Sequence, residues 1–345
     1  MALNALSDIS AALVEVLAPE LERQINRKAV LLSLLSKSTG RGPNCTWDVQ
    51  FSGASAAAFA EGADVGMGDF DHDVEKMAVL AWGGYRSSFA ISGLAQRVAA
   101  SARNVPAALT SLVAERGRGS AAQLASSINT ELYVGDGTSN SLVGLEVACA
   151  ATGSYAGLSK ATHSEWAGNT DGNSNVDRDL TKDLLDEMDQ AIYTACGEMP
   201  NVIVCSPGVA RKYSQLFDDN VRFAPPAGEL SAAGGVRAPQ GGPPGFTGYS
   251  YKGIPIYRDK DCPAGKLFML NTDYIELQSL RADAEGNTGA GGGGMSMSGD
   301  ASGIAVDYQF LAKTGDSNKF SFVTNVAMKV THPNALGLIE DIKET

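Results

Sequence analysis

The pattern of hydrophobic and polar residues divides the chain into helical and strand-like stretches. Between Leu6 and Leu35, apolar residues recur every three or four positions, which predicts a helical arm closed by Gly40 to Pro43. The segments CTWDVQF and VEKMAVLAWGGYRSSFAIS alternate apolar and polar residues as strands do. The tract between them is too poor in large apolar residues to bury itself. We therefore expect this hairpin to lie on its own chain's body or on a neighbour.

Two more helices and a strand follow in the central region. The run from Pro106 to Leu132 has helical spacing and predicts a helix about 40 Å long. Each glycine of RGRG within it weakens the helix by about 1 kcal/mol, which allows a kink there. A second helix is expected from Asp179 to Cys196. The buried-looking strand NVIVC then leads into Ser206 and Pro207, which open a helix that reaches Phe217.

The last third of the chain is typical of β structure. We expect strands in YSYKGIPIYRD, KLFMLN and YIELQSL. A glycine-rich stretch separates them from IAVDYQFLAKTGD and KFSFVTNVAMKVTHP, whose connecting turn predicts a hairpin.

Composition excludes several classes of protein. At 345 residues, with 44% hydrophobic residues, the chain is long enough for two domains. The net charge of -12 has the wrong sign for a protein that neutralises nucleic-acid phosphates. No apolar run approaches the roughly 20 residues that span a bilayer, and the N-terminus is unlike a signal peptide. We expect a cytosolic chain with no membrane partner.

Few residues are arranged for metal or redox chemistry. The cysteines are odd in number and never form C-x-x-C, so neither a disulfide framework nor a zinc site is indicated, and most should be small buried hydrophobes. The histidines lie far apart in sequence, and no cofactor is expected. The residues concerned are Cys45, Cys149, Cys196, Cys205, Cys262, His72, His163 and His332.

The stretch YVGDGTSNSLVG, from Tyr133 to Gly144, superficially resembles a phosphate-binding loop. The lysine of a Walker loop is missing, and GDG follows a helix, whereas a dinucleotide-binding loop precedes one. We interpret Gly135 and Gly137 as a helix-ending turn that needs positive φ angles.

The run DGNSNVDRD, from Asp171, places oxygen ligands at positions one, three and five of a calcium loop. Val176 and Lys182 stand where that loop needs glycine and glutamate, so a turn that caps the following helix through Asp177 or Asp179 is expected instead. The nucleophile elbow G-x-S-x-G is absent, which leaves a hydrolase as a distant alternative.

The order of these elements resembles the major capsid protein of tailed bacteriophages, which has the Hong Kong 97 fold. GDGT with Gly144-Leu145 after the long helix, and YKGIPIYRDKDCPAGKLFMLN, carry the resemblance. It implies an α+β fold. The parts of this fold are a helical N-terminal arm, an extended β-hairpin called the E-loop, a P-domain with a long spine helix and a β-sheet, and an A-domain with a central sheet flanked by helices. The implied division is 1–46 (arm), 47–92 (E-loop), 93–134 (P-domain spine helix), 135–270 (A-domain), 271–335 (P-domain strands and hairpin) and 336–345 (C-terminal tail).

The resemblance implies a shell-forming structural protein and not an enzyme. Pentamers and hexamers would form an icosahedral virion capsid in the bacterial host cytoplasm and enclose double-stranded DNA without sequence-specific binding. Partners would be a portal protein, a separate scaffolding protein, because only about 46 residues precede the E-loop, and a cement protein. Covalent cross-linking through lysine is not expected, because no lysine lies between Gly53 and Asp73. An encapsulin-type compartment, which loads an enzyme, and a monomeric α+β protein of another role stay open.

If the E-loop crosses a neighbouring subunit, its acidic residues need basic partners there. The acids are Asp69, Asp71, Asp73 and Glu75, and the candidate partners are Arg97 and Arg103 before the spine helix and Arg116 and Arg118 on it.

Overall fold

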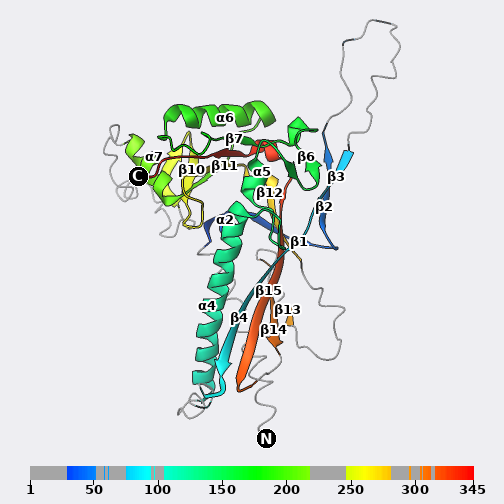
Figure 1. The fold of residues 1–345 in the computed structure, drawn as a ribbon, viewed down its shortest axis with the longest axis vertical. Helices are drawn as coiled ribbons and strands as arrows, with labels where there is room; N and C mark the ends of the chain where they lie inside the picture. Colours follow the sequence, from blue (N-terminus) through cyan, green and yellow to red (C-terminus); the bar gives the residue numbers. More distant parts are fainter. Residues whose placement is uncertain are drawn as a thin grey trace, which may run out of the picture.

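The structure, a computed structural model, consists of a broad upper body and a long stalk (Figure 1). It describes residues 29–51, 58, 61, 75–94, 97, 105–217, 246–280, 295–296, 304, 306–311 and 315–345. Two six-stranded sheets organise these parts. We call them the upper sheet and the stalk sheet.

The upper sheet has the strand order β7-β16-β11-β8-β10-β9. Its strands are β7 (Asn169–Asp171), β8 (Val202–Cys205), β9 (Phe246–Tyr251), β10 (Ile254–Arg258), β11 (Leu267–Leu270) and β16 (Gly337–Ile339). Helices α6 (Lys182–Cys196) and α7 (Pro207–Phe217) cover one face, where Ile203 and Cys205 point, and Val204 packs in the larger core on the other. Burial on both faces explains why NVIVC reads as a continuous apolar run.

The stalk sheet is built around β15 (Ser317–Val330), the longest strand that the structure describes. One side of β15 pairs with β4 (Gly83–Ser92), and the path β1-β12-β15-β14-β13 completes the sheet. The remaining strands are β1 (Ser36–Gly40), β12 (Ile275–Leu280), β13 (Met295–Ser296) and β14 (Asp307–Leu311). The β14–β15 hairpin was predicted from the sequence and is confirmed.

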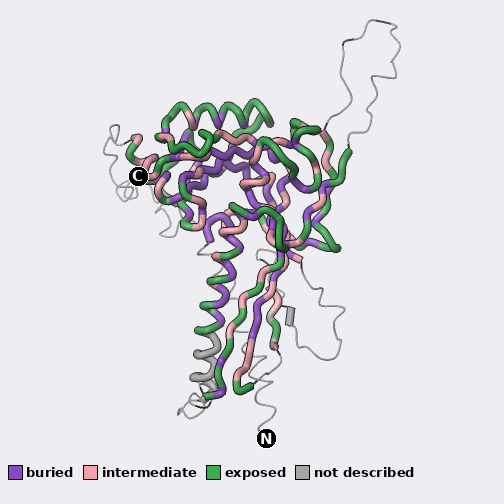
Figure 2. Tube along the Cα trace, in the orientation of Figure 1, coloured by how far each residue is buried: buried purple, intermediate pink, exposed green. Residues whose placement is uncertain are grey.

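Helix α4 (Val105–Val134) runs along the stalk beside β4 and ends at the upper body (Figure 1). It confirms the predicted long helix and passes through RGRG as one unbroken element. Gly117 of this stretch is buried, and the hydroxyl oxygen of Ser120 lies 2.7 Å from the hydroxyl oxygen of Ser87 on β4. Buried residues concentrate in the upper sheet and where α4 meets it (Figure 2).

Smaller elements complete the described fold. A two-stranded ribbon joins β2 (Cys45–Gln50) to β3 (Glu75–Leu80), and β5 (Ser154–Tyr155) pairs with β6 (Leu158–Ser159). Short helices are α2 (Val30–Leu34), α5 (Leu145–Cys149) and the 3-10 turns Ser164–Trp166, Thr272–Tyr274 and Pro333–Ala335.

The segment VEKMAVLAWGGYRSSFAIS forms two strands, so the expectation of one long strand is wrong. The chain leaves the ribbon after Leu80, and β4 pairs with β15. The Trp82 indole donates a hydrogen bond to the Gly42 carbonyl (3.1 Å), and the Gly83 backbone lies against Leu142, where an added Cβ would be 2.6 Å from the amide nitrogen. These contacts fix the break between the two strands.

Both ends of the described chain also differ from expectation. Helix α2 ends at Leu34, next to the predicted end of the helical pattern at Leu35, but strand β1, which follows it and pairs in parallel with β12, was not predicted. Residues 1–28 of the expected arm lie outside the described residues. At the other end, the expected tail contains β16, which is inserted between β7 and β11 and carries Ile339 at 0% exposure. A three-residue strand is too short to reveal itself by periodicity. The division into six segments stays a prediction.

Candidate functional site

The predicted interaction residues are spread over the molecule. Arg97 forms an exposed ion pair with Asp316 of the same chain, at 3.2 Å. Arg116 and Arg118 are exposed on α4, and Glu75 is exposed at the start of β3. Asp69, Asp71, Asp73 and Arg103 lie outside the described residues. Because α4 and β3 lie on opposite sides of the molecule (Figure 1), the structure does not bring Glu75 and the α4 arginines together within one subunit.

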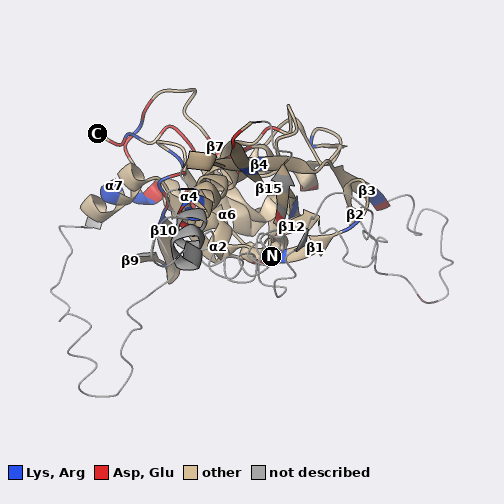
Figure 3. Ribbon diagram, turned by 90° about the horizontal axis from the view of Figure 1, so that it is seen from below, with Lys and Arg blue, Asp and Glu red and all other residues tan. Residues whose placement is uncertain are grey.

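Basic and acidic residues are intermixed along the described part of the chain. In the view along the stalk, Lys and Arg are scattered among Asp and Glu over the described ribbon (Figure 3). Such a distribution does not resemble the basic stripe of a nucleic-acid-binding domain.

Aromatic residues anchor the root of the β2–β3 ribbon to the body. Trp47 is buried and packs near Tyr155, with 6.4 Å between ring centroids. Phe51, directly after β2, stacks on His163 at 4.1 Å and meets the edge of Trp166 at 5.7 Å. The root of the predicted E-loop is therefore held by its own subunit, while residues 62–74 lie outside the described part.

The GDGT stretch is a structural turn at the end of α4. Gly137 has the predicted positive φ, at +76°, but Gly135 does not, so that half of the expectation is wrong. Gly135 is needed for space, because a Cβ there would lie 2.2 Å from the Leu142 carbonyl oxygen. The Asp136 carboxylate accepts hydrogen bonds from the Thr138 amide (2.9 Å) and hydroxyl, which lower its pKa. The turn thus uses this amide itself and does not offer it to a phosphate.

The calcium-like run is also occupied by the protein's own groups. Asp171 pairs with Arg178 at 3.0 Å, and the Asp341 carboxylate accepts from the amides of Asn173 and Asn175. Among the described residues, no three His, Cys, Asp or Glu side chains gather as a metal site. Nor does any described helix have the length and hydropathy to cross a membrane.

The helix after this run begins later than predicted. The hydroxyl of Thr181 accepts from the Leu184 amide at 3.3 Å and caps α6, so the expectation that Asp177 or Asp179 caps it is wrong. Threonine at this position serves the same purpose as aspartate, because either side-chain oxygen can satisfy an amide of the first turn.

The cysteines are free thiols, and four of the five are buried, as predicted for small hydrophobes. Burial raises the pKa of Cys45 to about 11 and those of Cys149 and Cys205 to about 12. These thiols are therefore protonated and unreactive near neutral pH.

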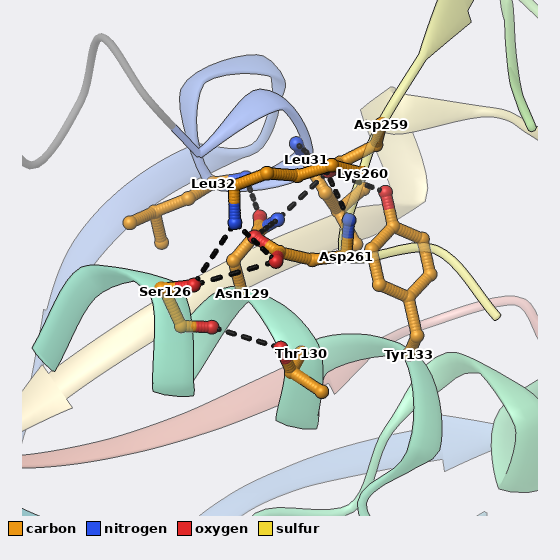
Figure 4. A network of polar contacts seen from close by, with 9 residues as sticks. All are labelled: Leu31, Leu32, Ser126, Asn129, Thr130, Tyr133, Asp259, Lys260 and Asp261. Atoms are coloured by element: carbon orange, nitrogen blue, oxygen red, sulfur yellow. Dashed lines mark hydrogen bonds and ion pairs between the residues drawn. The ribbon is translucent and has the colours of Figure 1, made fainter. Parts of the chain in front are cut away.

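A buried polar junction, missed by the sequence reasoning, lies where α4, α2 and the loop after β10 meet (Figure 4). Asp259 and Asn129 are both 0% exposed. The Asp259 Oδ2 atom accepts from Asn129 Nδ2 (2.8 Å), the Tyr133 hydroxyl (2.9 Å) and the Leu31 amide (3.3 Å). Burial and the neighbouring Asp259 raise the pKa of Tyr133 well above its usual value, so the hydroxyl stays protonated and acts as the hydrogen-bond donor. The carboxylate is thereby held by groups from two separate segments, α4 and residues 29–35.

The junction extends outward to the surface. Asn129 Nδ2 also donates to Asp261 Oδ2 (3.0 Å), and the Lys260 ammonium contacts Asp261 Oδ1 at 2.5 Å and the Ser126 hydroxyl at 3.1 Å. Lys260 is 63% exposed, whereas Asp261 is 10% exposed. The outer part therefore ends in an exposed ammonium group, whereas the inner part is fully buried.

Comparison with known protein families decides the identity. The model of the SU10 major capsid protein family matches residues 18–239, which includes β2, β3, α4, the GDGT turn and the β8–α7 unit. The chain belongs to this family. It is a shell-forming capsid protein of the virion, and the resemblance to tailed-phage capsid proteins is confirmed. A comparison with curated proteins gives no match.

Solved structures confirm the Hong Kong 97-like fold of this capsid protein. The capsid asymmetric unit of cyanophage A-1(L) is 20% identical, with a TM-score of 0.69 over 91% of this chain and 93% of that chain. The Gordonia phage Cozz structure is 12% identical, with a TM-score of 0.55 over 91% and 86%. The SrpI encapsulin complex of Synechococcus elongatus is 11% identical, with a TM-score of 0.53 over 91% and 88%. The fold is therefore common to phage shells and encapsulins.

Proposed function

We propose that this capsid protein forms pentamers and hexamers that close into an icosahedral shell around a double-stranded DNA genome, within the cytoplasm of a bacterial host. The observation that carries the proposal is the family match over residues 18–239. Encapsulins share the fold, so the fold alone does not decide the cargo, but the matched family is one of phage capsid proteins. Membership in a structural family favours a role without catalysis.

The net charge of -12 is consistent with DNA as cargo. A strongly basic wall would hold the packaged genome through its phosphates, whereas an acidic subunit leaves it free to move. We further propose that a portal and a separate scaffolding protein take part in assembly. A cement protein is proposed as well, because the E-loop tip from Gly53 to Asp73 carries no lysine from which a covalent cross-link could form.

We propose that the acidic E-loop residues contact α4 of an adjacent copy. Arg116 and Arg118 are the favoured partners, because both are exposed on a helix that lies opposite the ribbon of their own subunit. Arg97, which lies before the helix and pairs with Asp316 of its own subunit, is a further candidate. The proposed acids are Asp69, Asp71, Asp73 and Glu75, and Arg103 is retained as a further partner.

Charge reversal tests this contact. Each exposed ion pair contributes only about 0 to 1 kcal/mol, but a closed shell repeats it at every interface. The double variant Asp71→Lys, Asp73→Lys should therefore abolish particles in electron micrographs while the unassembled subunit keeps its thermal unfolding temperature. Adding Arg116→Glu and Arg118→Glu should restore particles.

A matched control separates this contact from a general effect of charge. Asp183→Lys with Glu187→Lys makes the same change in net charge on the exposed face of α6 and should leave assembly intact. Normal particles from the Asp71, Asp73 variant would remove the contact from consideration.

The cargo is tested on particles purified from phage-producing cells. Nuclease-protected DNA of uniform length supports a genome container. Particles that hold an enzyme and no DNA would support the encapsulin alternative.

A further inference from the structure

Residues 29–35 form a short segment docked into the body. Ala29, Leu31 and Leu32 are at most 1% exposed. Helix α2 within this segment has no side-chain cap of its own. Its first amides instead donate to distant side chains, Leu31 to Asp259 Oδ2 at 3.3 Å and Leu32 to Asn129 Oδ1 at 3.2 Å (Figure 4). The body thus recognises the backbone of this segment as well as its apolar side chains.

Asp259 is the centre of this recognition. Among the described residues, its hydrogen-bond donors are the amides of Leu31 and Asp261, the amide group of Asn129 and the Tyr133 hydroxyl, all neutral groups. A fully buried carboxylate is tolerated only when such donors replace its hydration. Loss of the Leu31 amide would leave the charge under-solvated, so undocking the segment carries an energetic cost at this site.

The donors to Asp259 come from separate parts of the subunit. Asn129 and Tyr133 lie on α4, which forms the stalk, whereas Asp259 and Asp261 follow β10 of the upper sheet. The Leu31 amide comes from the N-terminal segment. Asn129 accepts from the Leu32 amide at Oδ1 and donates through Nδ2 to Asp259, so these two hydrogen bonds polarise and strengthen each other.

We propose that Asn129 and Asp259 form a docking site that locks residues 29–35 onto the joint between the stalk and the upper sheet. The site reads the amides of residues 31 and 32 and couples their docking to the contact between α4 and the loop 259–261. This inference deepens the proposed capsid function by naming what holds the N-terminal segment to the subunit, and its test does not require assembly.

Hydrogen–deuterium exchange of the unassembled full-length protein, resolved to single amides, tests the lock. Asp259→Asn should speed exchange of the Leu31 amide about tenfold or more, because its acceptor is weakened. Asn129→Ala should do the same for the Leu32 amide. The core amides of Val204 and Phe268 should keep their wild-type rates in both variants.

Lys260→Ala is the matched control, because Lys260 contacts Asp261 and Ser126 at the exposed rim and should leave the Leu31 and Leu32 rates unchanged. Wild-type rates at Leu31 in Asp259→Asn and at Leu32 in Asn129→Ala would overturn the proposal. An equal rise at Val204 and Phe268 in both variants would also overturn it, since the pair would then support the whole core. A variant that forms no particles but keeps both rates slow argues against the lock's role in the shell and leaves the capsid function intact.

Discussion

Lys160 is a buried cation whose titration should be visible in the stability of the subunit. It is 3% exposed, and its ammonium donates to the carbonyls of Val147 (2.7 Å), Ala148 (3.0 Å) and Ala150 (2.6 Å) around the end of α5. Desolvation by burial lowers its pKa from 10.5 to about 8. The carbonyl dipoles hold the charged form in place but do not restore the lost hydration.

The sign and size follow from proton linkage. Between pH 8 and 10.5 the unfolded chain binds more protons at Lys160 than the folded chain, so the free energy of unfolding rises with pH across this window. At pH 7 the residue is charged in both states. At pH 9 it is one unit above its folded pKa, which makes the contribution of Lys160 about 1.4 kcal/mol more favourable than at pH 7.

Urea unfolding of the unassembled subunit at pH 7, 8 and 9 measures this contribution as a difference between proteins. The wild type should gain about 1.4 kcal/mol relative to Lys160→Met over this range. The wild type should show the same gain relative to Lys160→Arg, because arginine stays charged throughout this pH range and contributes no pH dependence of its own. The difference in free energy of unfolding between wild type and variant at each pH removes the contribution of cysteines and tyrosines, because these residues are present in every protein compared. A difference that is flat from pH 7 to 9 would refute the argument that burial depresses this pKa.

Two packing predictions concern other buried contacts. Gly83→Ala should lower the free energy of unfolding by about 1–3 kcal/mol, because the added Cβ would lie 2.6 Å from the Leu142 amide nitrogen. Gly84→Ala should cost less, because the atom nearest to its Cβ is 3.3 Å away. Similar urea midpoints for the two variants would contradict the steric explanation. Tyr155→Phe should cost about 1–3 kcal/mol in thermal or urea unfolding, because the buried hydroxyl donates to the Met328 carbonyl (2.9 Å) and accepts an amide of β15 (3.0 Å). An unchanged stability would mean that water replaces this hydroxyl.

Prediction succeeded where a long segment has one buried face, or where a short apolar run is followed by a helix cap. The α4 pattern located that helix to within a few residues, and NVIVC followed by Ser206-Pro207 located β8 and α7. These elements repeat their pattern over several turns or are marked by a cap, so local physics is sufficient. The same reasoning failed for β16 and for the break at Trp82, where strand length and partner depend on distant residues.

The candidate site was only partly accessible to sequence reasoning. Exposed charges such as Arg116 can be found from the sequence, but their partners cannot, because the proposed contact joins different copies. Asp259 stands in YRDKD as one acid among several, and no spacing distinguishes it from Asp261. Only the fold shows that Asp259 is fully buried and accepts a hydrogen bond from the Leu31 amide, 228 residues away.

The sequence by itself determined the class of fold, the long helix, the β14–β15 hairpin and the acidic balance. The tertiary structure decided that β4 belongs to the stalk sheet, that the chain's last residues complete the upper sheet and that Asn129 and Asp259 meet Leu31 and Leu32. The physical reason is that periodicity records whether a face is buried, which is a local property. The identity of the group that buries it depends on chain segments hundreds of residues apart.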